Sequence, residues 1–247
     1  MKVRIKFRKY GPIRFIGHLD VMRFFQKAMR RAEIDIAYTS GFSPHQIMSF
    51  AAPLGVGLES NGEYMDIECH SVTTSRDMME RLNSVSAPGI EVISVKQLPD
   101  NAGNAMASVA AAAYTVRFRE GREPGFDWIA ALPAFVATEE IIITKETKTG
   151  IKEVNIRPGI FHMYVKYAEN NEGTDAAAIH MLVDASSAGN LKPGKIVEAF
   201  LAANDEILQE NALLITREEV YTNAGTNEEP RLIPLDSVGY DIEENNA

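Results

Sequence analysis

Hydrophobic and polar residues alternate at the start of the chain. Apolar residues occupy positions 3, 5 and 7, and basic residues occupy the even positions from 2 to 8. This period of two predicts a β-strand with one buried face and one basic face. From His18 to Ala32 the apolar residues instead recur at spacings of three and four, which predicts an amphipathic helix with Asp20 in its first turn.

The same patterns predict the other elements. In the first half, strands are expected at 34–38, near 47–52 or 54–59, at 63–70 and at 90–95, with a turn at 60–62 and a helix at 75–83. The order β-α-β-β-α-β is that of the split βαβ, or ferredoxin-like, arrangement. In the second half, strands are expected at 114–119, 140–147, 161–167, 178–183 and 213–221, and helices at 126–135 and 192–202.

The sequence therefore predicts an α+β fold of two ferredoxin-like (split β-α-β) units with antiparallel or mixed sheets. The first unit is expected at 1–97, a loop-rich linker at 98–106 and the second unit at 107–222. The acidic tail at 223–247 has six Asp and Glu against one Arg. Two alternatives remain open for it: partial disorder, or a short docked strand in its LIPLDSVGY segment.

Composition limits the class of protein. No run approaches the roughly 20 apolar residues of a membrane span, and the start lacks the apolar block of a secretory signal, so we expect a cytoplasmic protein without membrane contact. The single cysteine, Cys69, excludes an intramolecular disulfide and a cysteine-based zinc or iron–sulfur site within this chain. Because Cys69 follows the apolar phase of its strand, we expect it to be buried.

Charge is distributed unevenly. Residues 1–50 contain ten Lys and Arg against three Asp and Glu, a balance of +7, and the chain total of −9 leaves −16 for residues 51–247. This asymmetry suggests a localised anion-binding face, for which nucleic acid is the obvious polyanion, and an uneven surface without a binding role is the open alternative. Arg4 and Lys6 are expected to pair across strands with Asp66 and Glu68. We therefore place the anion site on the first helix and the following loop.

The candidate site residues fall into two groups. The predicted RNA- or anion-binding residues are Arg14, Arg23, Lys27, Arg30, Arg31, Phe42 and His45. Phe42 is suited to stacking on a base. His18, Asp20 and His45 would support acid–base chemistry or a metal only if they converge, and the simpler interpretation is helix capping. No other catalytic motif is present, so we expect no cofactor and no metal, and we favour a non-catalytic role while enzyme activity stays an open alternative.

Several blocks of the sequence resemble one bacterial family. They are GPIRFIGHLDVMR at 11–23, GFSPH at 41–45, PLGVGLESNGEYMD at 53–66, IRP at 156–158, NLKP at 190–193 and ITREEVY at 215–221. These blocks resemble the radical SAM-associated, or radical SAM-linked, proteins, a domain of unknown function. Ser43 stands where Asn is usual and Gln46 where a second Pro is common, differences that concern the geometry of the loop.

The resemblance implies a partner. Members of that family look like companions of, or fusions to, radical SAM enzymes, which bind an iron–sulfur cluster through three cysteines. This chain has one cysteine, so the resemblance implies an accessory role beside such an enzyme.

Three hypotheses for the function follow. The leading one is a non-catalytic accessory protein that binds RNA or an RNA-linked substrate for a radical SAM enzyme. The second is a protein–protein adaptor for that enzyme without nucleic-acid contact. The third is an enzyme that acts on RNA through His18, Asp20 and His45.

Overall fold

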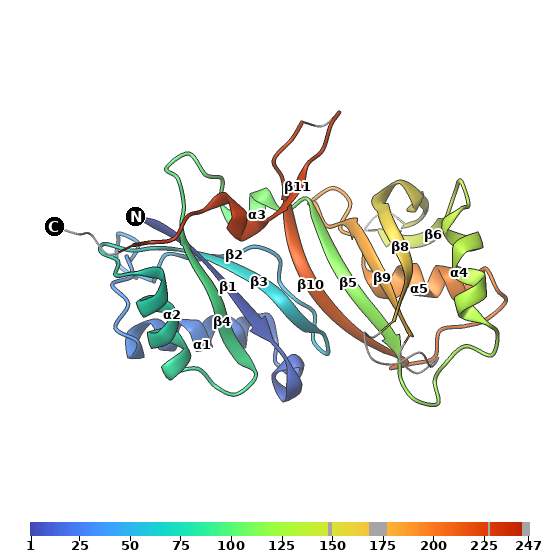
Figure 1. Ribbon diagram of the computed structural model, residues 1–247, viewed down its shortest axis with the longest axis horizontal. Helices are drawn as coiled ribbons and strands as arrows, with labels where there is room; N and C mark the ends of the chain where they lie inside the picture. The colour runs from blue at the N-terminus through green and yellow to red at the C-terminus, as the bar shows by residue number, and fades with distance from the viewer. Residues whose placement is uncertain (148–149, 168–176, 227, 244–247) are drawn as a thin grey trace. The chain divides into compact units, whose positions relative to one another are not determined.

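The computed structural model describes residues 1–147, 150–167, 177–226 and 228–243 and shows a mixed α+β protein (Figure 1). The chain forms two compact units. One consists of Met1–Ala110 together with Arg217–Ala247, and the other of Ala111–Thr216. In the described part of the chain, no helix is both long enough and apolar enough to cross a membrane.

The first unit combines helices with an antiparallel sheet. Its elements are β1 (Lys2–Lys9), η1 (Gly11–Phe15), α1 (His18–Arg31), β2 (Met48–Phe50), β3 (Glu59–Glu68), α2 (Ser75–Ser84), β4 (Ile90–Gln97), α3 (Ala105–Ser108), β11 (Leu232–Pro234) and η4 (Leu235–Val238). Strand β10 (Leu213–Asn223) enters this unit at Arg217. The strand order here is β4-β1-β3-β10, with β2 on β3 and β11 on β10.

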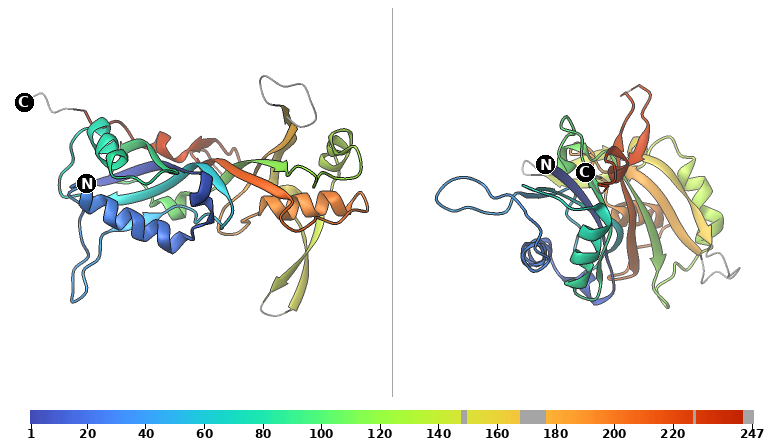
Figure 2. Two further views of the ribbon diagram at one scale, coloured as in Figure 1. Left: turned by 90° about the horizontal axis from the view of Figure 1, so that it is seen from below. Right: turned by 60° about the vertical axis from the view of Figure 1, so that its left-hand side comes forward.

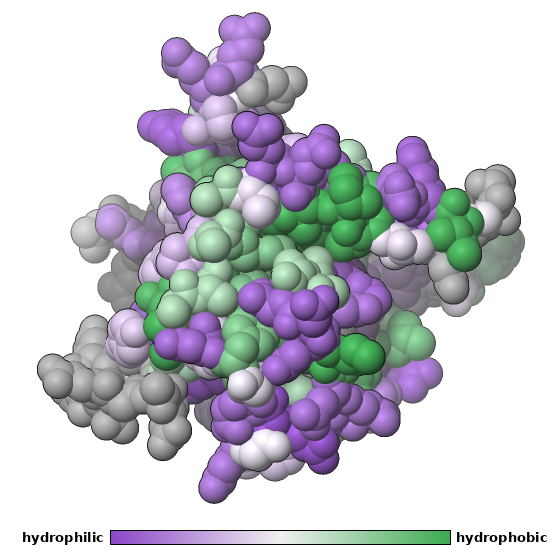
Figure 3. Space-filling view, turned by 90° about the vertical axis from the view of Figure 1, so that its right-hand side faces the viewer, coloured by the Kyte–Doolittle hydropathy of each residue, from purple (hydrophilic) through white to green (hydrophobic). Residues whose placement is uncertain are grey.

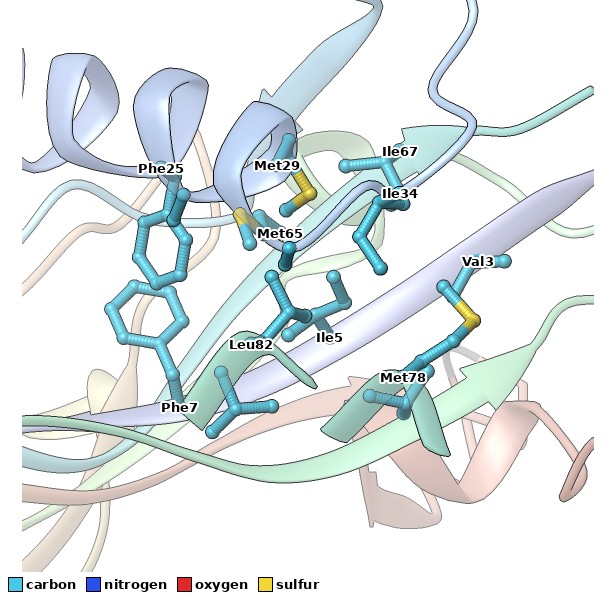
Figure 4. Close-up of a cluster of buried hydrophobic side chains, with 14 of the residues drawn as sticks. Val3, Ile5, Phe7, Phe25, Met29, Ile34, Met65, Ile67, Met78 and Leu82 are labelled. Carbon is cyan, nitrogen blue, oxygen red and sulfur yellow. The ribbon is translucent and has the colours of Figure 1, made fainter. Parts of the chain in front are cut away.

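Helices α1 and α2 cover the apolar face of this sheet. Val3, Ile5 and Phe7 of β1 point toward residues of both helices (Figure 4), and all three are at most 1% exposed. The Phe7 and Phe25 rings lie 4.6 Å apart between centroids. The strand and helix periods of the sequence therefore predict this core correctly, and Cys69 is buried at its edge as expected.

The C-terminal segment docks on the opposite face of the sheet. Arg4 is 1% exposed and donates two hydrogen bonds to Asp66, at 2.7 and 2.9 Å. Its Nη1 also donates to the Leu235 carbonyl at 2.9 Å, and the Leu235 side chain is fully buried. Of the two alternatives for the tail, the docked strand is confirmed for the described residues as β11, and 244–247 lie outside them.

Several sequence predictions for this unit are wrong in detail. Residues 60–62 lie inside the long strand β3 rather than in a turn, and 34–38 form only isolated bridges. Arg4 faces Asp66 as expected, but Lys6 faces Tyr64 instead of Glu68. The β-α-β-β-α-β order is present, but β2 has only three residues and β10 also neighbours β3. The observed class is α+β, and a ferredoxin-like unit is not established.

The domain limits also differ from those expected. Residues 98–106 were predicted to be a linker, yet Leu98 is 3% exposed and the Ala105 amide donates to Asp66 at 2.7 Å. The chain passes into the second unit at Ala111, and residues from Arg217 onward return to the first. The first unit is thus built from both ends of the described chain.

The second unit contains a smaller antiparallel sheet and a separate hairpin. Its elements are β5 (Ala111–Phe118), α4 (Trp128–Val136), β6 (Ile142–Thr147), β7 (Gly150–Asn155), η2 (Arg157–Gly159), β8 (Ile160–Tyr167), β9 (Ala177–Asp184) and α5 (Pro193–Ala202). The order is β5-β9-β8, and β6 pairs only with β7. Trp128 belongs to this unit's core, with its ring against Phe118. The side shown in Figure 3 carries hydrophobic surface bordered by hydrophilic side chains.

Candidate nucleic-acid interface

Only part of the predicted basic patch is available to a ligand. Among the ten Lys and Arg of residues 1–50, five form ion pairs: Arg4–Asp66, Lys6–Glu219, Arg8–Glu91, Arg14–Glu59 and Arg23–Asp20. Lys9 is buried. Within residues 1–50, all of which the structure describes, the exposed cations without an ion pair are Lys2, Lys27, Arg30 and Arg31. The +7 balance therefore overstates the free positive charge.

Three of these cations form a stripe on the second half of α1. Lys27, Arg30 and Arg31 are separated by three and four residues, so they share one side of the helix. They point to solvent because the opposite side of α1, including Phe25 and Met29, is buried in the core. Cations near a helix C-terminus are also favoured by the helix dipole. We refer to Lys27, Arg30 and Arg31 as the α1 stripe.

The Gly-Phe-Ser-Pro-His segment forms the tip of a long loop that projects from the first unit (Figure 2). The Thr39 amide donates to the His45 carbonyl at 2.9 Å, and the Thr39 hydroxyl lies 3.1 Å from His45 Nδ1. These bonds close the loop and leave Phe42, at 112% relative exposure, entirely in solvent. An aromatic ring with no intramolecular packing is suited to stacking on another molecule.

The base of this loop contacts α1. The Gln46 side-chain amide donates to the Gln26 carbonyl at 3.3 Å, one residue before the α1 stripe begins. Gln46 is 7% exposed, so this contact is part of the packed structure. The base of the loop therefore meets the half of the helix that carries Lys27, and Phe42 lies farther out, at the projecting tip.

The possible catalytic group is not assembled. The His18 ring packs edge-on against Phe50, with centroids 5.0 Å apart, and Asp20 pairs with Arg23 at 3.3 Å. In the described structure no hydrogen bond joins His18, Asp20 and His45, and no group of three or more His, Cys, Asp or Glu is arranged for a metal. Gln26, where the loop meets α1, lies about 12 Å along the helix axis from His18.

Arg14 is also separate from the α1 stripe. Its guanidinium pairs with Glu59 at 3.1 Å and lies over the Phe15 ring, 4.9 Å from the centroid. Because η1 precedes the start of α1, Arg14 lies at the His18 end of the helix. Of the predicted anion-binding residues, Arg14 and Arg23 have carboxylate partners. The α1 stripe lies on the half of the helix that the loop base contacts, and Phe42 and His45 lie in that loop.

The structure reveals a buried charged cluster that the sequence interpretation missed. Lys9 donates to the Ile16 carbonyl at 2.9 Å, and burial lowers the pKa of Lys9, with the nearby Glu63 acting in the opposite direction. Arg217 donates from Nε to Glu63 at 2.8 Å and from Nη2 to the Ala52 carbonyl at 2.6 Å. The period of two could have identified Lys9 and Glu63, because both follow the apolar phase of their strands.

This cluster holds loops in place rather than a ligand. Lys9, His18 and Glu63 border a cavity of about 10 Å³, which is barely enough for one water molecule. Lys9 fixes the segment before α1, and Arg217 fixes the segment after β2. The Lys9 contacts help to define the entry of the chain into the first helix.

The outer face of the sheet is closed to stacking bases. The Tyr64 hydroxyl donates to Glu219 at 2.6 Å and lies 3.2 Å from Asp236, while Lys6 pairs with Glu219 at 2.5 Å. Burial, reinforced by Glu219, raises the pKa of Tyr64 far above its ordinary value. This internally satisfied network, covered by the docked C-terminal segment, leaves α1 and its loop as the better candidate surface.

Comparison with known proteins gives a family assignment. A family model described as uncharacterized protein conserved in bacteria (DUF2344) matches residues 2–193, and the chain belongs to that family. No curated protein matches the chain.

Proposed function

We propose that this member of the DUF2344 family is a non-catalytic accessory protein that binds RNA or an RNA-linked substrate. The observation that supports the proposal is a stripe of three cations without an ion pair, Lys27, Arg30 and Arg31, on the half of α1 that meets the base of a projecting loop. The tip of that loop carries the exposed ring of Phe42. The cations would contact phosphates, and Phe42 and His45 would contact a base.

Single-stranded RNA is the form of ligand that this surface fits. Stacking of Phe42 requires an unpaired base, and the α1 stripe offers charge without a fixed hydrogen-bonding pattern for base edges. The remainder of the chain is acidic, with −16 over residues 51–247. That charge would repel a polyanion from other surfaces and restrict binding to the positively charged region.

The proposal includes a radical SAM enzyme as the partner. This part rests on the sequence resemblance of the 11–23, 41–45 and 53–66 blocks. The chain contains one cysteine, which is buried, so it would rely on another protein for a cluster bound by three cysteines. The accessory protein would present the bound molecule to that enzyme.

The α1 stripe provides the direct test. The triple variant Lys27→Gln, Arg30→Gln and Arg31→Gln should weaken binding of single-stranded RNA in a fluorescence anisotropy titration. Because log K falls with log salt by about 0.7 per phosphate contact on single strands, the slope should become shallower by about 2.

A matched control removes three cations that already have carboxylate partners. Arg8, Arg76 and Lys96 pair with Glu91, Glu80 and Asp241. Their combined replacement by Gln changes the net charge equally and should leave most of the affinity and the salt slope intact. An absence of RNA binding by the wild-type protein at low salt would overturn the proposal.

A protein–protein adaptor is the second candidate function. Phe15, Leu19 and Val56 are 59%, 60% and 61% exposed and offer apolar surface to a partner protein. Phe15 and Leu19 lie next to the start of α1, away from the stripe. Co-purification of a radical SAM enzyme after nuclease treatment, together with no RNA affinity, would favour this function over the first.

A further inference from the structure

The second unit contains a cavity of about 640 Å³. It lies between the β6–β7 hairpin, η2 and the segment that leads from β9 into α5. Figure 2 shows the hairpin extending from its unit, and β6 pairs with no strand other than β7 among the described residues. The volume falls within the range of about 300–1,000 Å³ that is typical of small-molecule sites.

The walls of this cavity are largely aliphatic. Ile143 and Val154 face each other across the hairpin, and Leu191 contributes from the segment before α5. Ile151 also lines the cavity and is 75% exposed, so a ligand would remove apolar surface from water. Among its described lining residues none is aromatic, which favours an aliphatic ligand body over a stacked ring.

The charged groups of the lining are mainly positive. Among the described lining residues, Lys145, Lys192 and Lys195 are accompanied by a single carboxylate, Asp184, which gives these residues a balance of +2. Residues 111–216 as a whole contain ten Lys and Arg against fifteen Asp and Glu, a balance of −5. A positive site in an acidic unit is suited to selecting an anion. Lys195 also pairs with Glu198 at 2.7 Å, but both side chains are at least half exposed, so that pair is weak.

The one carboxylate is already used by the protein backbone. Asp184 Oδ1 accepts a hydrogen bond from the Ser186 amide at 2.8 Å, and the Asp184 carbonyl accepts one from the Leu191 amide at 2.9 Å. A Cβ atom at Gly189 would collide with the Asp184 carboxylate, so glycine is needed for this close approach. The segment that forms one wall is therefore preformed.

We propose that this cavity binds a small organic anion with an aliphatic body. Lysines 145, 192 and 195 would hold the anionic head, which is a carboxylate or a phosphate, and Ile143, Ile151 and Leu191 would cover the aliphatic part. Because all lining residues belong to the second unit, whereas the α1 stripe belongs to the first, this site is independent of the proposed RNA-binding function.

Isothermal titration calorimetry on the full chain tests the proposal. The probes are octanoate and octyl phosphate below their micelle concentrations, with octanol and inorganic phosphate as probes for the body and the head alone. We expect saturable binding at one site for at least one of the two anionic probes, and the stronger of them identifies the head group. Octanol that binds as tightly as the anions, or no saturable binding by either anion, would overturn the proposal.

Variants of exposed lining residues locate the binding. Lys145→Gln and Ile151→Asn should each weaken the better probe by about tenfold, because each removes one class of contact. Lys166→Gln is the matched control, since Lys166 is an exposed lysine of the same unit that does not line the cavity. Affinity that is unchanged in the two cavity variants, or equally reduced in the control, would contradict the assignment.

Discussion

A cluster of charged side chains is buried in this protein. Lys9, Glu63 and Arg217 are at most 6% exposed. Transfer of an ion pair out of water costs about as much as the pair regains, so such a cluster is weak evidence of added stability. Here its clear effect is positional, because Lys9 and Arg217 each donate to carbonyls of the segments around the start of α1.

Substitution of Glu63 tests how strongly the cluster depends on the Glu63 carboxylate. Glu63→Gln keeps the shape of the side chain but leaves Lys9 and Arg217 without the negative charge that faces them. We expect the free energy of unfolding to fall by about 3–5 kcal/mol, as when one partner of a buried pair is removed. Urea denaturation followed by circular dichroism measures the change.

The exposed pair of Arg8 and Glu91 is the control for that measurement. Their side chains are 40% and 43% exposed and approach to 3.2 Å. Arg8→Gln should cost less than about 1 kcal/mol, because solvent screens exposed pairs. Equal losses in the two variants would mean that burial of the Glu63 cluster has no energetic consequence.

At the scale of elements, the sequence predicts the structure that depends on residues near one another in the chain. The period of two identifies β1 and the period of three to four identifies α1, because each pattern reflects burial against the same core. Within β3 the sequence predicts a turn, because Ser60, Asn61 and Gly62 have the composition of a turn. In the structure, Ser60 instead pairs with Lys9 beyond a register shift. Tertiary pairing overrides turn propensity here.

In the candidate site, too, contacts between residues close in the sequence are predictable, whereas contacts between distant residues are not. Helical phase predicts that Lys27, Arg30 and Arg31 share an exposed side of α1, and the pairing of Arg23 with Asp20 is readable from their spacing of three. The pairing of Arg14 with Glu59 spans 45 positions, and no local sequence pattern indicates it. Contacts of Arg217 with Glu63 across 154 positions are equally inaccessible to sequence reasoning.

The exposed ring of Phe42 in the projecting loop leads to a separate prediction. Phe42→Ala should leave the free energy of unfolding unchanged, because the ring is fully exposed and packs on nothing in the described structure. The same variant should lose about 1–3 kcal/mol of affinity for single-stranded RNA if the ring stacks on a base. Fluorescence anisotropy and urea denaturation measure the two quantities separately.

Phe15→Ala serves as the comparison for the loop variant. Phe15 is 59% exposed but lies in η1, before the start of α1 and away from the stripe. Its removal should reduce RNA affinity by much less than that of Phe42. If the two variants lose the same affinity, the loop has no special role in the interface.

At the scale of the whole molecule, the chain forms two units with separate cores. The first core contains residues of β1, α1 and α2, and the second contains residues of β5, α4 and α5. Sequence order alone suggested consecutive domains, because nothing local shows that the segment after Arg217 returns to the first unit. The pairing of β11 with β10 and the buried Leu235 account for that return.

The chain supplies one natural probe for each unit. Cys69 is the only cysteine and lies in the first unit, and Trp128 is the only tryptophan and lies in the second. Burial raises the pKa of the Cys69 thiol to about 11, so in the folded unit it is both shielded and protonated. Because the thiolate is the reactive form, pulse labelling of Cys69 should report unfolding of its unit.

Substitutions in the two cores should change the urea midpoints reported by these two probes by unequal amounts. Leu82 and Phe200 are fully buried, in the first and second core respectively. Leu82→Ala should destabilise the first unit by about 2–5 kcal/mol and lower the urea midpoint of Cys69 labelling more than that of Trp128 fluorescence. Phe200→Ala should do the reverse, because two separate cores need not unfold as one state. Identical midpoints for both probes in both variants would instead show that the two cores unfold as a single cooperative system.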